Sequence, residues 1–297
     1  MIAGRRREDE VSKKQIVALA LGAAGSLMLA TMAHSAEIKV LSTQATEEAY
    51  RELVPQFEKA SGHKVTTTFT GTLDANKRLA AGETYDLLIM SAPSIDEHIK
   101  TGRVVSGSRV DLAKSGVGVG VKAGAPKPDI STTEALKKAL LAARSIGYST
   151  GPSGVYMVGV FQRMGIADGI GGKFKQTPTG VFVGSIIANG EAEIGFQQVS
   201  ELSHFRGVDY VGPLPADIQR FTTFSSGILA GAKEADAAKA LVKFITAPEA
   251  ASASRSGAWN RADARGARTP ARALRTCCRK RRRDEIMRIA RSVLLFQ

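Results

Sequence analysis

The amino-acid sequence predicts an α/β fold in which a mainly parallel sheet is flanked by helices. Two observations lead to this prediction. Strand-like and amphipathic helical patterns alternate between residues 38 and 90 in the order β-α-β-α-β, which is typical of a parallel sheet covered by helices. The alternation continues to residue 246, and neither an internal repeat nor a low-complexity segment interrupts residues 37–252.

The first half of this region has the clearer patterns. The predicted elements are a strand at 38–43, a helix at 47–60, a strand at 63–70, a helix at 71–79 and a strand at 85–90. The first helix carries apolar residues at the i, i+3, i+4 and i+7 spacing of one buried face. Thr43 or Thr46 can cap this helix and Gly62 can end it, while Pro55 argues against a straight helix.

The second half is predicted from shorter signals. The predicted strands are 116–121, 146–150, 192–196, 208–211 and 223–229, and the predicted helices are 135–142, 155–164, 181–189 and 233–246. Gly and Val alternate in the 116–121 segment, which we expect to cross between two lobes. Ser131 and Glu134 have the spacing of a capping box ahead of the 135–142 helix.

The N-terminus has the pattern of a secretory signal peptide over residues 1–36. Lys13 and Lys14 precede a short apolar run at 16–30, and small residues follow at 33–36, with cleavage expected after Ser35 or Ala36. The apolar run is shorter than the ~20 residues that a membrane-spanning helix needs. We therefore expect export to the bacterial periplasm.

The C-terminal segment, 253–297, differs from the rest in composition. It holds 13 basic and 3 acidic residues, and both cysteines, Cys277 and Cys278, lie in it. One interpretation is a disordered basic tail for nucleic acid or an anionic membrane. We favour another, a frameshift product, because shifting the codons of residues 258–260 by two bases gives a plausible final strand. The gene sequence tests this hypothesis.

The charge distribution argues against nucleic-acid binding by the middle of the chain. The net charge of +13 suggests a nucleic-acid partner, but residues 37–252 hold 23 basic and 22 acidic residues. No cysteine lies in this region, and His63, His98 and His204 lack metal-ligand spacing. We therefore expect no metal, no cofactor and no nucleic-acid partner.

Catalytic motifs are missing as well. The sequence contains no Gly-x-Ser-x-Gly elbow, no P-loop and no His-Glu-x-x-His motif. Asp86 and Glu191 have no acidic partner spaced for acid–base work. The sequence therefore favours a binding protein over an exported α/β enzyme with an unrecognised site.

Four small, polar loops are candidates for a ligand site. They are Ser42–Thr46, Thr70–Thr72, Gly151–Gly154 and Thr177–Gly180, and each joins a predicted strand end to a predicted helix start. Helix N-termini carry unpaired N–H groups and partial positive charge, so such loops suit anions. Each loop alone is explained by helix capping, but four together favour a site at the carboxyl ends of the strands.

The order of several motifs resembles the periplasmic molybdate-binding proteins of ABC importers. The similarity covers about residues 37–252 and includes Phe57–Gly62, Gly82–Ile89, the GPSGVY segment at 151–156 and Gly190–Gly195. The resemblance implies a two-lobe fold of the periplasmic-binding-protein type, with an oxyanion such as molybdate or tungstate held between the lobes. It also implies a monomer that delivers its ligand to an ABC permease in the inner membrane.

The resemblance also suggests ligand-binding residues and lobe boundaries. The candidates, by position in the family's motifs, are Thr43, Ala45, Thr46, Thr72, Ser153, Gly180 and Gln198. Ala45 stands where the family has a hydroxyl and Gln198 where it has a tyrosine, so another small anion or a carboxylate is the alternative ligand. The implied organisation is lobe 1 at 37–113, lobe 2 at 114–212 and a return to lobe 1 at 213–252.

Overall fold

A computed structural model describes residues 35–248 and 250. The strands are β1 (Glu37–Thr43), β2 (Lys64–Thr70), β3 (Leu87–Ser91), β4 (Val110–Lys122), β5 (Ile146–Tyr148), β6 (Phe174–Gln176), β7 (Ile194–Gln198), β8 (Val208–Pro213) and β9 (Phe221–Ile228). The α-helices are α2 (Glu47–Ser61), α3 (Thr72–Ala80), α4 (Ala92–Lys100), α5 (Thr133–Ala142), α6 (Pro152–Arg163), α7 (Ala167–Ile170), α8 (Val183–Ala188), α9 (Val199–Leu202) and α10 (Ala235–Ile245). Two 3-10 turns, η1 (Gln44–Thr46) and η2 (Gly171–Lys173), complete the set.

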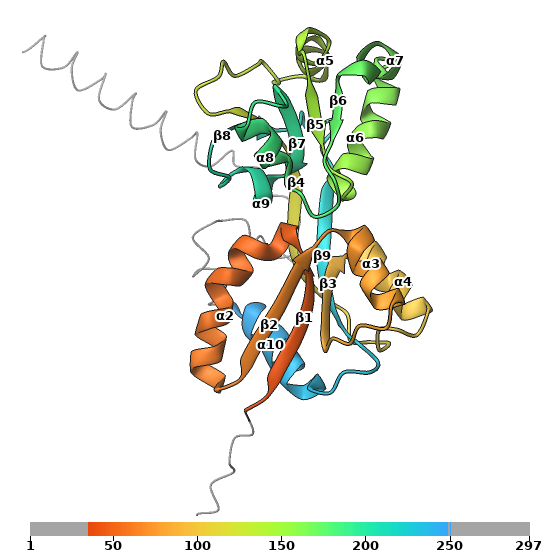
Figure 1. Cartoon of the computed structure of the whole chain (residues 1–297), viewed down its shortest axis with the longest axis vertical. Coiled ribbons are helices and arrows are strands. Elements are labelled where there is room, and N and C mark those ends of the chain that lie inside the picture. Colours follow the sequence, from red (N-terminus) through yellow and green to blue (C-terminus); the bar gives the residue numbers. More distant parts are fainter. Residues whose placement is uncertain (1–34, 249, 251–297) are drawn as a thin grey trace, which may run out of the picture.

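The elements form two lobes, each with part of one continuous sheet (Figure 1). The strand order is β2-β1-β3-β9-β4-β7-β5-β6, and β8 also pairs with β4. The β1–β2, β1–β3, β5–β6 and β5–β7 pairs are parallel. The sheet is covered by helices, which confirms the predicted α/β class.

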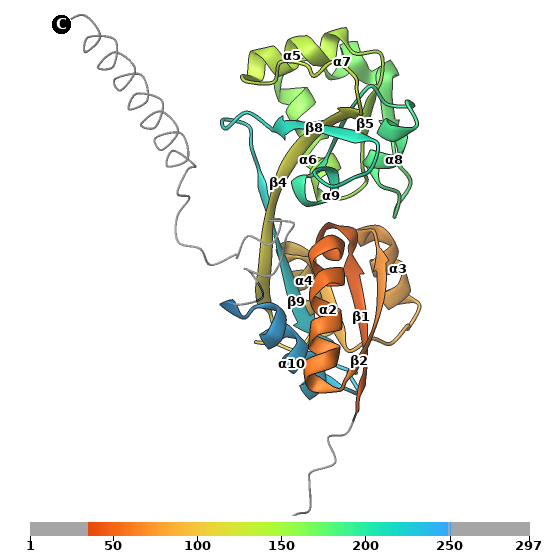
Figure 2. The same cartoon turned by 90° about the vertical axis from the view of Figure 1, so that its left-hand side faces the viewer.

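The long strands β4 and β9 run from one lobe into the other, as Figure 2 shows from the side. The first half of β4 pairs with β9, and its second half pairs with β7 and β8. These pairs, like β3–β9, are antiparallel, so the strands that connect the lobes make the sheet mixed. The predicted boundary between residues 113 and 114 falls inside β4, and the lobe boundaries stay predictions.

Each lobe has its own hydrophobic core. In the first lobe, Tyr50, Leu53 and Phe57 of α2 pack with Leu241 and Ile245 of α10. The core of the second lobe includes Phe161 of α6 and Phe196 of β7, whose rings meet edge to face at 5.8 Å. Two separate cores joined by two strands allow the lobes to move against each other without unpacking either core.

Asp86 has a structural role in the first lobe. Its Oδ2 accepts a hydrogen bond from the backbone N–H of Lys39 at 2.8 Å. Its Oδ1 accepts from the N–H groups of Lys233 and Glu234, at 2.8 and 2.9 Å, just before α10. The buried carboxylate therefore joins β1 to the start of the last helix.

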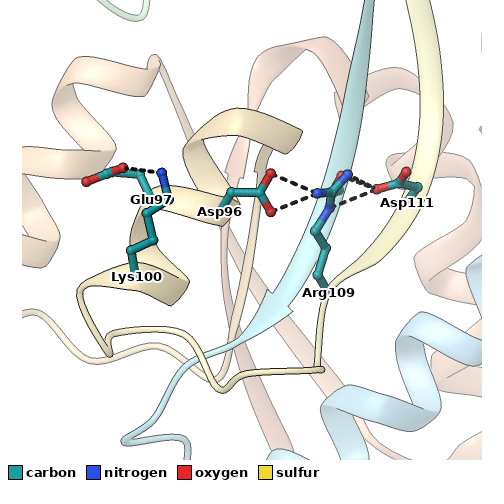
Figure 3. A network of polar contacts seen from close by, with 6 residues as sticks. Asp96, Glu97, Lys100, Arg109 and Asp111 are labelled. Carbon is teal, nitrogen blue, oxygen red and sulfur yellow. Dashed lines mark hydrogen bonds and ion pairs between the residues drawn. The ribbon is translucent and has the colours of Figure 1, made fainter.

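A surface ion-pair network ties α4 to the start of β4 (Figure 3). Arg109 makes a two-pronged contact with Asp96, at 2.7 and 2.9 Å, and reaches Asp111 at 2.8 Å. Burial acts to raise the pKa of the Asp111 carboxyl, but the hydrogen bond from Ser225 and the Arg109 guanidinium together outweigh burial and hold this pKa below its usual range. The network fixes the start of β4 within the first lobe.

Some local predictions need correction. α6 begins at Pro152, not Val155, because proline suits the first turn of a helix, so the GPSG segment is partly helical. Thr132, not Ser131, caps α5 by accepting from the Ala135 N–H. α2 continues through Pro55, and neither Thr43 nor Thr46 caps a helix with its side chain.

Other elements were placed imprecisely or missed. α8 begins at Val183, two residues later than expected. α4, α7 and α9 have no counterpart in the sequence prediction, which implied β6 only as the strand end before the Thr177–Gly180 loop and gave it no bounds. Within residues 35–248 and 250, no helix has both the length and the hydrophobicity of a bilayer span. The hypotheses about residues 1–34 and 253–297 lie outside the described residues.

Candidate functional site

The four predicted loops meet between the lobes and line a small cavity of about 40 Å³. Thr43 and Gly71 come from the first lobe, and Ser153 and Gly180 come from the second. In each lobe these loops follow the carboxyl ends of parallel strands, which is where α/β sheets place ligands. This volume holds roughly two or three waters, or one carboxylate-sized group.

Thr43 presents a buried polar atom to this cavity. The residue is 6% exposed, and its Oγ1 has no hydrogen-bond partner among the described residues. A buried hydroxyl without a partner costs free energy, and a ligand atom in the cavity would remove that cost. Ala45 also lines the cavity, but its methyl group offers no hydrogen bond.

Two helices begin at this cavity without a side-chain cap. They are α3, which starts at Thr72 after Gly71, and α6, which starts at Pro152 after Gly151. Their first-turn N–H groups have no intrahelical partner and carry partial positive charge. The third expected helix start is different, because the side-chain oxygen of Gln197 accepts from the Val183 N–H at 2.8 Å and so caps α8.

The lobes touch each other directly over the cavity. The side-chain amide of Gln44, in the first lobe, donates to the Gly180 carbonyl oxygen, in the second lobe, at 2.7 Å. A Cβ atom at Gly71 would lie 2.8 Å from Cγ2 of Thr179 and 3.1 Å from the Gly180 nitrogen. Glycine at position 71 therefore allows the two backbones to approach, and the structure represents a closed cleft.

Glycine is also required at the start of α6. A Cβ atom at Gly154 would lie 1.7 Å from the Ser149 carbonyl oxygen, so no side chain fits there. The Gly151 N–H donates to the Ser149 hydroxyl at 3.2 Å, which fixes the turn before the helix. Ser153 is buried against this turn and lines the cavity.

Six of the seven predicted site residues line the cavity, and Thr46 does not. The Thr46 hydroxyl is instead 2.9 Å from the Ser42 hydroxyl and donates to the Thr43 carbonyl oxygen. Gln198 lines the cavity, but its amide is engaged with the connecting strands. Oriented by its hydrogen bonds, it donates to the Ser115 and Gly116 carbonyl oxygens and accepts from Thr222.

Glu201 is a site residue that the sequence reasoning missed. It lines the same cavity, in α9, and its carboxylate accepts from the Gln198 N–H at 3.2 Å. Burial raises the pKa of this carboxyl to about 7, the hydrogen bonds from Gln198 and Gln197 oppose the rise, and the charge of Glu47 adds to it. The cleft therefore holds a carboxyl that changes protonation near neutral pH.

A larger cavity of about 710 Å³ adjoins the small one. The two share Thr72, Thr150, Gly151 and Pro152 in their linings. We call the small cavity the inner chamber and the large one the outer chamber. The outer chamber is open to solvent and is lined by exposed apolar residues of both lobes, with Arg163 and Arg220 among them.

Comparisons with known proteins agree with this architecture. The family described as "bacterial extracellular solute-binding protein" matches residues 38–257. A solved periplasmic molybdate-binding protein of Azotobacter vinelandii superposes with a TM-score of 0.64 at 19% identity, over 75% of this chain and 98% of that chain. These findings confirm the resemblance seen in the sequence motifs and the fold that it implied.

Two curated relatives carry names that refer to different compounds. An aconitate isomerase of a Pseudomonas species is 36% identical over 222 residues, which cover 73% of this chain and 84% of the relative. The molybdate-binding protein ModA of Azotobacter vinelandii is 28% identical over 235 residues, which cover 77% of this chain and 91% of the relative.

Proposed function

Because this chain belongs to the bacterial extracellular solute-binding proteins, we propose that it binds a small organic acid in the cleft between its lobes and delivers it to an ABC permease. The observation that carries the proposal is the inner chamber. There an unpartnered, buried Thr43 hydroxyl and two uncapped helix starts meet. These groups all suit an anionic oxygen.

Glu201 favours a carboxylic acid over a tetrahedral oxyanion such as molybdate. An ionised carboxylate beside a bound dianion is repulsive, and this repulsion weakens binding. A carboxyl with a pKa near 7 can instead stay protonated and donate its hydrogen to a ligand carboxylate, so that one proton serves two carboxyl groups. The methyl group of Ala45 and the engaged amide of Gln198 also remove the family's usual contacts for an oxyanion.

Isothermal titration calorimetry on the purified chain tests this proposal. The panel contains molybdate, tungstate, sulfate, a monocarboxylate, a dicarboxylate and a tricarboxylate. We expect heat of binding with a carboxylate and a weaker or absent response to molybdate and tungstate. Tight binding of molybdate with no response to any carboxylate would show that the family's oxyanion is retained here.

Glu201 also supports a second candidate, an isomerase acting on an unsaturated polycarboxylate. A carboxylate base can remove a proton from the CH₂ next to a carbon–carbon double bond. The C–H electron pair then forms a new double bond, and the proton returns to the carbon at the far end of the original one. The product has the same formula as the substrate, and no other reactant is needed.

Proton NMR of cis- or trans-aconitate in D₂O with the chain tests the second candidate. An isomerase would convert one isomer into the other and exchange its allylic hydrogens for deuterium. The Glu201→Gln variant should lose both signals. Binding of aconitate without conversion or exchange would leave transport binding as the function.

A further inference from the structure

We propose that the outer chamber is a second part of the ligand site, in which Arg163 and Arg220 bind additional carboxylate groups of a polycarboxylate. This inference rests on the proposed function, because it assumes that a first carboxylate occupies the inner chamber. It restricts the class of ligand to compounds that carry at least two carboxylates separated by a short carbon chain.

Among the residues that the structure describes, the two arginines have no counter-ion. Neither guanidinium forms an ion pair or a side-chain hydrogen bond with any residue that the structure describes. Both instead lie over the ring of Tyr156, at 5.4 Å for Arg163 and 5.3 Å for Arg220. Arg109, by contrast, is neutralised by two aspartates (Figure 3). Two unneutralised cations on one ring repel each other, and a bound anion relieves that repulsion.

Tyr156 holds this arrangement in place. Its hydroxyl donates to the Ile218 carbonyl oxygen at 2.8 Å, which ties α6 to the segment that carries Arg220 into β9. Gly159 leaves room for the other arginine, since a Cβ atom there would lie 3.3 Å from Nη1 of Arg163. The guanidiniums are therefore positioned before a ligand arrives, which reduces the entropy lost on binding.

The rest of the lining fits the carbon chain of an organic acid. Val155 and Phe221 are 68% and 66% exposed, and Leu73 faces the same chamber from the first lobe. Within the described part of the chain, no acidic residue lines the outer chamber. The shared residues Thr72 and Gly151 place it directly beside the inner chamber, and the proposal is that one molecule occupies both. A compact tetrahedral oxyanion would fill only the inner chamber.

Calorimetry with matched ligands separates this inference from the proposed function. The probes are tricarballylate, a saturated tricarboxylate that has no double bond to isomerise, and butyrate, a monocarboxylate of similar chain length. The variants are Arg163→Gln and Arg220→Gln. Lys138→Gln is the control, because it removes one exposed positive charge from α5, outside both chambers.

We expect each arginine variant to weaken tricarballylate binding about tenfold and to leave butyrate binding within about twofold, since a charge-assisted hydrogen bond is lost only for the longer ligand. Lys138→Gln should change neither. Equal tricarballylate affinity in wild type and both arginine variants would overturn the inference and leave the proposed function standing. Failure of the wild type to bind either carboxylate would overturn the proposed function and this inference with it.

Discussion

Replacing Glu201 with glutamine should change how the stability of the protein depends on pH. Burial raises the pKa of the Glu201 carboxyl from its ordinary value of 4.5 to about 7, so the folded, closed protein favours the neutral form. In the unfolded chain the same carboxyl ionises near its ordinary value. Between these two pKa values the folded state binds more protons, and the free energy of unfolding therefore falls as pH rises.

The size of the effect follows from the shift. The rise in the Glu201 pKa corresponds to about 3 kcal/mol of unfolding free energy, and water entering the cleft screens part of this effect. We therefore expect the free energy of unfolding to fall by about 1–2 kcal/mol between about pH 4.5 and pH 8. Glutamine has no charge to titrate, so the Glu201→Gln variant should lack this part of the pH dependence. The stability is fully present below the ordinary pKa and is lost as pH rises through about 7.

Urea denaturation of wild type and variant at about pH 5 and about pH 8 measures this difference. Subtracting the unfolding free energy of the variant from that of wild type cancels the contributions of the other carboxylates. These include Asp74 and Asp111, whose lowered pKa values make stability fall as pH falls, the opposite direction. Glu191→Gln is the control, because it removes an exposed carboxyl of the same lobe and should leave the pH dependence of stability close to that of wild type. A wild-type-minus-variant difference that is the same at both pH values would refute the reasoning.

Three further substitutions separate stability from ligand binding. Gly71→Ala places a methyl group 2.8 Å from Cγ2 of Thr179 in the other lobe and so opposes closure. Calorimetry should show ligand affinity reduced about tenfold, while urea denaturation should give a free energy of unfolding within ~1 kcal/mol of wild type. Unchanged affinity would mean that closure is not needed for binding. Thr43→Val removes an unpartnered buried hydroxyl, so it should leave stability unchanged or higher and weaken binding about tenfold, and equal affinity would show that the ligand does not contact this hydroxyl. Asp86→Ala removes the acceptor of three backbone N–H groups and should lower the free energy of unfolding by about 3 kcal/mol. Ligand affinity should stay unchanged at temperatures where the variant is folded. A loss below ~1 kcal/mol would contradict the structural role of Asp86.

The sequence predicted the site well where the signal was local. Small polar residues after strand ends identify all four loops, and parallel strands bring such loops to one edge of a sheet. Thr43, Thr72 and Gly180 were found in this way or through the family resemblance, and the structure places them around one cavity. The α/β class followed from the alternation of two hydrophobic periods over 38–90.

The features that were missed depend on contacts between distant parts of the chain. Glu201 reads as an ordinary first-turn acid of a short helix, and its raised pKa comes from burial in the folded protein together with the charge of Glu47, more than 150 residues away. Arg163 and Arg220 lie on different elements and meet only over Tyr156. α4 was missed because Pro93, in its first turn, follows a strand directly and suggests a loop.

Thr46 shows the limit of carrying a site over by position. Its hydroxyl is one of several in the 42–46 loop, and the sequence cannot show which of them face the cleft. In the structure, η1 turns Thr46 toward Ser42 and leaves Thr43 facing the cavity. The orientation of a side chain within such a short turn depends on backbone angles that residue types alone do not fix.

A crystal structure of the protein with its bound ligand tests the central claim most directly. We expect a carboxylate in the inner chamber, within hydrogen-bond distance of Thr43 Oγ1 and of the first-turn N–H groups of α6. The lobes should be closed by the contact between Gln44 and Gly180, as they are here. A ligand bound outside the cleft, or an inner chamber holding only water in a saturated complex, would contradict the account.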